Sequence, residues 1–252
     1  MSVAVSGAVS GADQSRVALV TGAGRRVGRA IALDLAAQGW SVAVHHHASA
    51  AGAAEVVKQI RVAGGRAEAF AADLTDPHAL EALIPNVVAW SGRLDALVSS
   101  AAGMTRTPIG STTAASVDGI LALNLRAPFL LAQSAAAHLG EGGAIVLIGD
   151  HMADESWPDY VMHGVAKAGV HALTRHLAAA LAPRIRVNAV APGAVLLPND
   201  GAPQLAERLS AEAALRRIGT PSDVAGAVRY LLDAPFVTGQ VLRVDGGRGL
   251  DA

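Results

Sequence analysis

A glycine-rich turn near the amino terminus limits the folds open to this 252-residue chain more than any other feature. The apolar run at residues 17–20 leads into Thr-Gly-Ala-Gly-Arg-Arg-Val-Gly at residues 21–28, and a helix-like stretch follows. Glycines allow a tight turn close to a pyrophosphate, and the free N–H groups at a helix start stabilise that anion. A turn without a ligand is the alternative. We predict a dinucleotide phosphate loop made by Gly22, Gly24, Arg25, Arg26, Val27 and Gly28.

Apolar, strand-like runs alternate with helix-like stretches along the chain. The predicted strands are residues 17–20, 41–45, 66–71, 96–98, 144–148, 186–190 and 240–244. The predicted helices are residues 28–37, 53–63, 77–90, 113–138, 163–182 and 221–233. Mostly apolar strands separated by helices are typical of a parallel sheet covered on both faces. We predict a single-domain α/β Rossmann fold over residues 15–252, a doubly wound parallel seven-stranded sheet with helices on both faces, after a flexible tail of residues 1–14.

Charge and cysteine content exclude several kinds of partner. The formal net charge of -1 gives no overall field for nucleic acid or an anionic membrane, and the absence of cysteine excludes disulfides and thiolate metal sites. We count no apolar run of the roughly 18 residues that a membrane helix needs. Residues 1–14 lack the basic start of a secretion signal. We expect a cytoplasmic protein that binds a small molecule, with a substrate lid within residues 192–216.

The second predicted strand indicates which dinucleotide binds. NAD-binding folds usually carry an acid at the end of this strand to hold the ribose hydroxyls, and no acid lies within residues 36–53. Arg25 and Arg26 offer cations to a 2′-phosphate, and His47 and Ser49 offer further donors. We therefore predict NADPH as the cofactor. The triplet of residues 45–47 is not expected to bind a metal, because successive strand residues face opposite ways.

Motifs beyond the phosphate loop carry a family resemblance. They are Asp73-Leu74 after the third strand, Asn124 within Leu-Asn-Leu, Pro192-Gly193 after a strand, and Val-Asp-Gly-Gly at residues 244–247. With the phosphate loop, these motifs resemble the short-chain dehydrogenase/reductase family over residues 17–247. The resemblance implies that Asp73 and Leu74 contact adenine and that Lys167 holds the nicotinamide ribose. It also places Ser99, Ala101, Pro192 and Gly193 beside the cofactor, and it implies a homotetramer or a dimer.

Within that family the chain is most similar to pteridine reductases and their bacterial relatives. Arg26 stands where most members have glycine, and the second strand ends in histidines. Asp150 stands where most members have the catalytic serine, and residues 236–240 also resemble that branch. Three positions differ from it: Ser99 and Ser100 replace paired asparagines, and Met104 replaces a phenylalanine that stacks on the pterin.

The resemblance implies an unusual catalytic set. The family has a tyrosine four residues before Lys167 and thirteen after the position of Asp150, and His163 stands there. Histidine can donate a proton, so we hypothesise that Asp150 and His163 act as a coupled donor pair. Asn124 would orient Lys167 through water. Tyr160 is expected on the same helix face as Lys167, two turns or roughly 10 Å away.

We assign Met104, Asp150, Trp157 and Tyr160 to the substrate side. The favoured interpretation is an NADPH-dependent oxidoreductase that reduces a small carbonyl or a cyclic imine, with pterins among the candidates. One alternative is a family member that binds the cofactor without hydride transfer. Another is a site that performs non-redox acid/base chemistry. Stoichiometric NADPH oxidation would separate the first from the other two.

Overall fold

The computed structural model describes residues 15–196 and 203–250. The predicted tail of residues 1–14 and part of the predicted lid, residues 197–202, lie outside the described residues. The strands form one sheet in the order β3-β2-β1-β4-β5-β6-β7, and every pair in it is parallel. The strands are β1 (Val17–Val20), β2 (Ser41–His46), β3 (Ala67–Ala71), β4 (Leu94–Ser99), β5 (Leu139–Ile148), β6 (Ile185–Pro192) and β7 (Val241–Val244).

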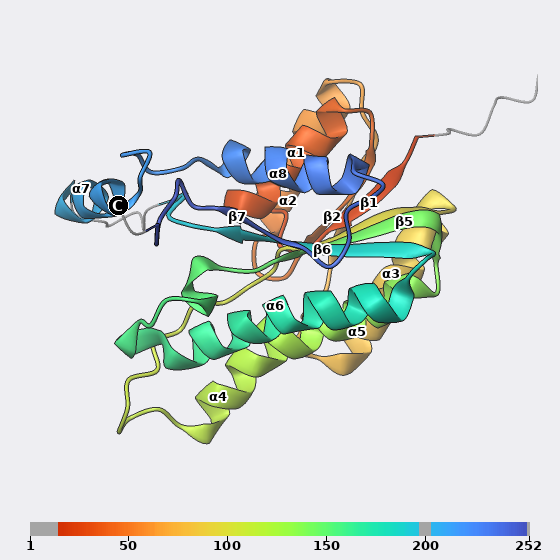
Figure 1. The fold of residues 1–252 in the computed structure, drawn as a ribbon. Helices are drawn as coiled ribbons and strands as arrows, with labels where there is room; N and C mark the ends of the chain where they lie inside the picture. The colour runs from red at the N-terminus through yellow and green to blue at the C-terminus, as the bar shows by residue number, and fades with distance from the viewer. Residues whose placement is uncertain (1–14, 197–202, 251–252) are drawn as a thin grey trace, which may run out of the picture.

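Helices cover both faces of the sheet (Figure 1). One layer holds α1 (Arg26–Ala37), α2 (Ala50–Val62) and α8 (Pro221–Asp233). The other holds α3 (Pro77–Ser91), α4 (Ala114–Leu121), α5 (Ala127–Ala136) and α6 (Val161–Leu181). The α7 helix (Pro203–Glu212) lies beyond the sheet, beside the carboxyl ends of the strands. The predicted doubly wound seven-stranded fold is confirmed.

Strand residues alternate between two cores. Ala18 and Val20 of β1 belong to the cluster under α1, α2 and α8, whereas Leu19 between them belongs to the cluster under α3, α5 and α6. The same alternation runs through β4, where Leu97 faces the second cluster and its neighbours face the first. A strand buried on both faces needs apolar side chains at every position, which explains the continuous apolar runs in the sequence.

The sheet order reverses at β1, and this reversal places the site. Strand β1 pairs with β2 on one side and with β4 on the other. The loops after β1 and β4 therefore leave the sheet toward opposite helix layers and open a crevice at the carboxyl edge. The Thr21 hydroxyl joins the two loops, accepting from the N–H groups of Ser100 and Ala101 at 2.9 Å each.

The helix predicted over residues 113–138 is interrupted. A π-helical turn, η1 (Ala122–Arg126), separates α4 from α5. Pro128 lacks the N–H that would bond to the Asn124 carbonyl, and the Asn124 side chain donates to the Ile120 carbonyl at 3.0 Å. Both effects widen the helix, and such turns are frequent at functional sites.

The segment Ala114–Ala136 contradicts the expectation that no apolar stretch is long enough for a membrane helix. By length and composition alone it is long and apolar enough to cross a membrane. In the structure this segment belongs to the helix layer on one face of the sheet, and its residues Ala127, Leu131 and Ala135 are fully buried in the second core cluster.

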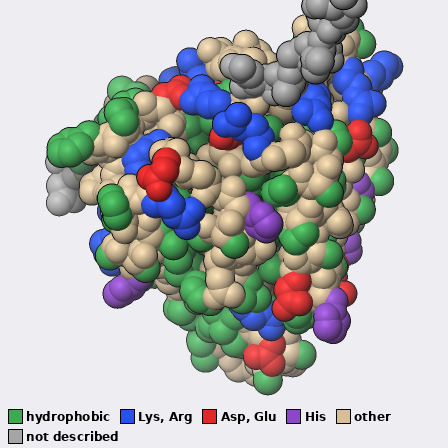
Figure 2. Space-filling model, turned by 90° about the vertical axis from the view of Figure 1, so that its right-hand side faces the viewer, with side chains coloured by type: hydrophobic (Ala, Val, Ile, Leu, Met, Phe, Trp, Pro, Cys, Tyr) green, Lys and Arg blue, Asp and Glu red, His purple; other side chains and the backbone are tan. Residues whose placement is uncertain are grey.

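Figure 2 shows the side of the molecule away from α7, where acidic and basic side chains are interspersed.

Candidate active site

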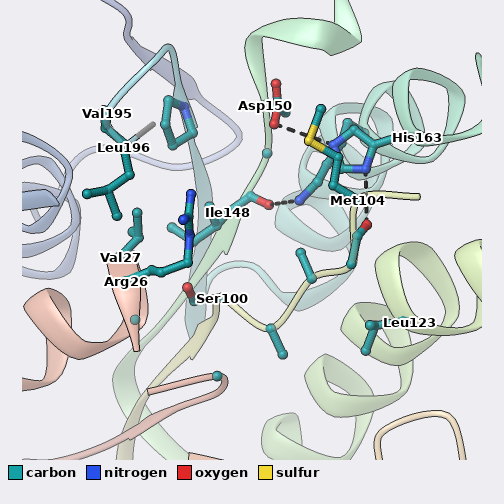
Figure 3. Close-up of a pocket in the computed structure, with 18 of the residues that line it drawn as sticks. Arg26, Val27, Ser100, Met104, Leu123, Ile148, Asp150, His163, Val195 and Leu196 are labelled. Carbon is teal, nitrogen blue, oxygen red and sulfur yellow. Dashed lines mark hydrogen bonds and ion pairs between the residues drawn. The ribbon is translucent and has the colours of Figure 1, made fainter. Parts of the chain in front are cut away.

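A cavity of about 700 Å³ occupies the crevice at the carboxyl edge of the sheet. The phosphate loop forms one end of it, and Met104, Asp150 and His163 form the other (Figure 3). Lys167 lines the cavity one helical turn after His163, and residues of α7 also contribute to the lining. The structure thus brings residues 22–28 and residues 104–163, two predicted parts of the site that are far apart in sequence, into one cavity.

The phosphate loop requires glycine at two of its positions. Gly22 has φ +65°, a left-handed conformation that favours glycine. A Cβ atom at Gly28 would lie 2.4 Å from the Gly22 carbonyl oxygen, so the start of α1 packs directly on the turn. Gly24 is not part of the cavity lining. A Cβ there would lie 2.5 Å from the Ser49 hydroxyl, because the loop packs against the start of α2.

His45 supports the phosphate loop from beneath, a role that the sequence did not reveal. The Gly22 N–H donates to His45 Nδ1 at 3.1 Å, and His45 Nε2 faces the Ala72 carbonyl at 3.1 Å. Burial lowers the pKa of His45 to about 4, with smaller contributions from its histidine neighbours, against the opposing hydrogen bond to Ala72. The ring is therefore neutral at pH 7, and it holds the turn with one accepting and one donating nitrogen.

Cationic and polar groups surround the outer part of the phosphate end. Arg25, Arg26, His47 and Ser49 all line the cavity. Arg26 has φ +52°, which non-glycine residues adopt rarely. His47 Nε2 lies 3.9 Å from Asp73 Oδ2, and hydrogen bonds from the Thr75 hydroxyl and N–H hold the pKa of Asp73 below its usual range. The predicted residues Val27 and Leu74 also line this end.

Asp150 and His163 meet at the opposite end, as the spacing predicts. Asp150 follows β5, and His163 lies in the first turn of α6 with 3% of its surface exposed. His163 Nε2 lies 3.5 Å from Asp150 Oδ2, and His163 Nδ1 lies 3.2 Å from the Gly103 carbonyl (Figure 3). Because both nitrogens face oxygen acceptors, only the doubly protonated ring can donate to both.

A second imidazole contacts the same carboxylate, and the sequence analysis missed it. His151 Nδ1 lies 3.1 Å from Asp150 Oδ1 and 3.1 Å from the Pro192 carbonyl. Burial raises the pKa of Asp150, but hydrogen bonds from His151, His163 and the Met152 N–H outweigh it and hold that pKa well below its usual range. The only sequence signal was the position of His151 next to Asp150, which does not fix where a side chain points.

Lys167 is a buried ammonium beside this pair. It lies one turn after His163 on α6, and its Nζ donates to the Ile148 carbonyl at 2.8 Å. Burial lowers the pKa of Lys167, and the charge of Asp150 opposes that shift. The α6 helix therefore presents one titratable ring and one cation to the cavity from the same face.

The Asn124 side chain has partners other than those we expected. It does not line the cavity: its Nδ2 donates to the carbonyls of Gly103 and Ile120 at 3.0 Å, and its Oδ1 accepts from the Gly103 N–H at 3.2 Å. This side chain thus fixes Gly103, whose carbonyl faces His163. The predicted link from Asn124 to Lys167 through water stays a prediction.

The substrate side has an apolar and aromatic wall. Met104, Trp157 and Tyr160 line the cavity there, and the centroids of the Trp157 and Tyr160 rings lie 6.3 Å apart at an interplanar angle of 65°. Tyr160 is not on the face of α6. It ends the 3₁₀ turn η3 (Pro158–Tyr160), because α6 begins only at Val161.

One residue that we predicted beside the cofactor lies outside the cavity lining. Ser99 is buried within β4 and does not line the cavity, whereas the next residue, Ser100, does. The other residues placed beside the nicotinamide by the resemblance, Ala101, Pro192 and Gly193, line the cavity. Within residues 15–196 and 203–250, no group of three or more His, Cys, Asp or Glu side chains could hold a metal ion.

Comparison with known proteins agrees with this geometry. Residues 22–248 match the family model described as enoyl-(acyl carrier protein) reductase. An uncharacterized oxidoreductase of Methylorubrum extorquens is 37% identical over 242 residues, covering 93% of this chain and 98% of that protein. A hydroxynaphthalene reductase-like protein of Metarhizium brunneum is 36% identical over 251 residues, covering 92% of this chain and 94% of that protein.

Solved structures show the same fold. A dehydrogenase/reductase from Sinorhizobium meliloti has a TM-score of 0.88 and 41% identity, covering 93% of this chain and 95% of its own. A short-chain dehydrogenase from Burkholderia cenocepacia in complex with NADP has a TM-score of 0.89 and 36% identity, covering 94% of this chain and 99% of its own. The angucycline C-6 ketoreductase LanV with bound NADP has a TM-score of 0.86 and 33% identity, covering 94% of this chain and 96% of its own.

The Rossmann sheet, the glycine-rich loop at its reversal and the titratable groups across the cavity define an oxidoreductase of the nicotinamide-dependent class. More specifically, the chain belongs to the short-chain dehydrogenase/reductase family. Similarity to the pteridine reductase branch stays a prediction.

Proposed function

We propose that this protein is an NADPH-dependent reductase of a carbonyl or cyclic imine group on a planar, largely apolar substrate. The observation that carries the proposal is the juxtaposition of Asp150 and His163 with Lys167, at one end of a cavity whose other end is a phosphate loop. Bound NADPH would supply the hydride to carbon. The chain itself must then supply one proton to the oxygen or nitrogen, to complete a two-electron reduction.

The residues of the phosphate end suit NADPH. The Gly22–Gly28 contact leaves no side chain between the turn and a pyrophosphate. Arg25, Arg26, His47 and Ser49 would hold the 2′-phosphate, and the β2 end carries no carboxylate to repel it. Asp73 and Leu74 would contact adenine, and Lys167 the nicotinamide ribose. The NADP in the Burkholderia and LanV structures supports this choice.

The proton would come from His163, in the position where the family has tyrosine. Its Nε2 lies beside Asp150, and both residues line the cavity, so a substrate oxygen placed next to Nε2 would accept its proton. Asn124 keeps the Gly103 carbonyl on the other ring nitrogen and so fixes the ring plane.

The wall of the substrate side supports a flat, apolar ring system. Trp157 and Tyr160 contribute aromatic rings to the lining, and Met104 contributes a thioether, which adapts to aromatic faces. The names of the Metarhizium relative and of LanV refer to a hydroxynaphthalene and to an angucycline. We therefore place bicyclic aromatic ketones first among the substrates and pterins second.

One observation favours a second candidate, non-redox acid/base chemistry in the same cavity. Both His163 nitrogens already have acceptors within the chain, the Gly103 carbonyl and the Asp150 carboxylate. A site of this kind can move protons without a hydride. Product formation with unchanged NADPH would select this candidate.

Titration calorimetry with NADPH and NADH tests the cofactor assignment. We expect micromolar NADPH binding, and NADH binding at least tenfold weaker. Arg25→Gln combined with Arg26→Gln should weaken NADPH and leave NADH unchanged, because only the 2′-phosphate is lost as a partner. A screen of ketones, imines and pterins for NADPH oxidation follows. If neither NADPH nor NADH binds, the reductase proposal is overturned.

We also propose a cytoplasmic homotetramer or dimer. Phe129 of α5 and Val161 and Val165 of α6 are exposed apolar side chains on adjacent helices, as an interface between copies requires. Light scattering should give a mass of two or four chains, and a monomer at micromolar concentration would contradict the proposal.

A further inference from the structure

One carboxylate at the centre of the site is shared by two imidazoles from different elements. Asp150 Oδ2 faces His163 of α6, and Asp150 Oδ1 faces His151 of the 3₁₀ turn η2 (His151–Ala153). Oδ1 also accepts the Met152 N–H at 2.9 Å. Two donors therefore fix Oδ1, and this arrangement leaves Oδ2 turned toward the reacting end of the cavity.

The surroundings of His151 determine which of its nitrogens carries a proton. Nδ1 faces two oxygens that can only accept, the Asp150 carboxylate and the Pro192 carbonyl, so it must be the donor. Nε2 is buried without a hydrogen-bond partner and lies 3.9 Å from Glu155 Oε2. The ring packs edge-on against Trp157 at 5.8 Å.

The charges around His151 favour its cationic form. Asp150 and Glu155 flank it, and Arg248, from the loop after β7, holds Glu155 at 2.8 Å and pairs with Glu212 of α7. From α6, His163 and Lys167 face the far side of Asp150. Burial lowers the pKa of His151, but Asp150, Glu155 and the Pro192 carbonyl outweigh burial and raise it.

We propose that His151 is a positioning residue of the donor pair: it acts as an imidazolium that fixes Asp150 Oδ1, so that Oδ2 stays aligned with His163. The inference rests on the proposed function, because it assigns His151 a role in that reaction. His151 does not itself donate the substrate proton. Its effect on turnover passes through the orientation and charge of Asp150.

Steady-state kinetics separates this role from a packing role. His151→Leu removes the donor and should lower kcat about ten- to hundredfold, with the KM for NADPH unchanged. His151→Asn keeps a nitrogen donor near the Nδ1 position and should retain kcat within about threefold of the wild type. His176→Asn, an exposed position on α6, is the matched control and should be unaffected. Equal kcat in His151→Leu and wild type would overturn the proposal.

Nitrogen-detected NMR of the histidine rings, on the protein without cofactor, tests the same claim when no substrate turns over. We expect His151 protonated at Nδ1, with a titration midpoint above the ordinary 6.5 that falls in Glu155→Gln and falls further in Asp150→Asn. A ring protonated only at Nε2, or a midpoint unchanged in Asp150→Asn, would overturn it. If the NMR results are as expected but no substrate is turned over, only the proposed function is contradicted, and the placement of His151 against Asp150 stands.

Discussion

At the residue scale, Asp150 is the charged group that the other titratable side chains of the site surround. Its carboxylate contacts two imidazoles and a backbone N–H, and its charge supports the buried ammonium of Lys167. The thirteen-residue spacing between Asp150 and His163 predicted their meeting, because it matched a known family pattern. His151 and the Gly103 carbonyl were not predictable in the same way, since their contacts depend on how two loops fold back on the helix.

Removing the Asp150 charge should destabilise the fold. In Asp150→Asn we expect the free energy of unfolding at pH 7 to fall by about 2 to 4 kcal/mol, because buried cations lose their partner. Asp154→Asn is the control: its ion pair with Arg243 is half exposed, and it should cost less than about 1 kcal/mol. Urea unfolding measures both.

The pH dependence of that loss gives a further check. The pKa of Asp150 is lowered in the folded state, so its contribution is fully present above the ordinary aspartate pKa of about 3.9 and is lost as pH falls through the folded value. The difference between Asp150→Asn and wild type should thus be no smaller at pH 5 than at pH 7, because Asp150 stays charged over this range and also raises the pKa of His151, which favours the folded wild type as pH falls. Equal losses in Asp150→Asn and Asp154→Asn would contradict the account.

At the element scale, the strands and most helices were predictable, and the turns were less so. Apolar runs between glycines and polar clusters gave the strands within a few residues, except that β5 begins at Leu139 rather than at residue 144. The π-helical turn was missed because its cause is local, a proline and an asparagine within one helix-like pattern. Tyr160 was misplaced by the same kind of boundary error, since a short turn precedes α6.

The loop after β1 is held by His45 of β2, which accepts the Gly22 N–H. Because this imidazole can be protonated, the contact is sensitive to pH. The pKa of His45 is about 4 in the folded protein against about 6.5 unfolded, so its contribution to stability is present above pH 6.5 and is lost as pH falls toward 4. We expect a loss of about 2 kcal/mol between pH 7 and pH 5 that is absent in His45→Gln.

Chemical unfolding at the two pH values measures this difference. His46→Gln is the control, because it removes the neighbouring, partly exposed imidazole of the same strand. An identical pH dependence in wild type and His45→Gln would show that the ring under the phosphate loop is not held neutral.

At the scale of the whole molecule, the fold brings together what the chain separates. The phosphate loop, the β4 loop, Asp150 and α6 lie far apart in sequence, and the parallel sheet places them around one cavity at its carboxyl edge (Figures 1 and 3). This placement follows from sheet order and was predictable from the alternation of strands and helices. The part that α7 contributes to the cavity lining was not predictable in this way, because it depends on how the preceding loop places that helix.

The central claim is that the cavity transfers a hydride from NADPH and a proton from His163. We would incubate the protein with NADPH deuterated at the transferable C4 position and a panel of bicyclic aromatic ketones, and analyse products by mass spectrometry. The account predicts one deuterium in each product molecule, one NADPH oxidised per product, and turnover lowered at least about a hundredfold in His163→Ala with NADPH affinity preserved. Product without deuterium, or full activity in His163→Ala, would contradict it.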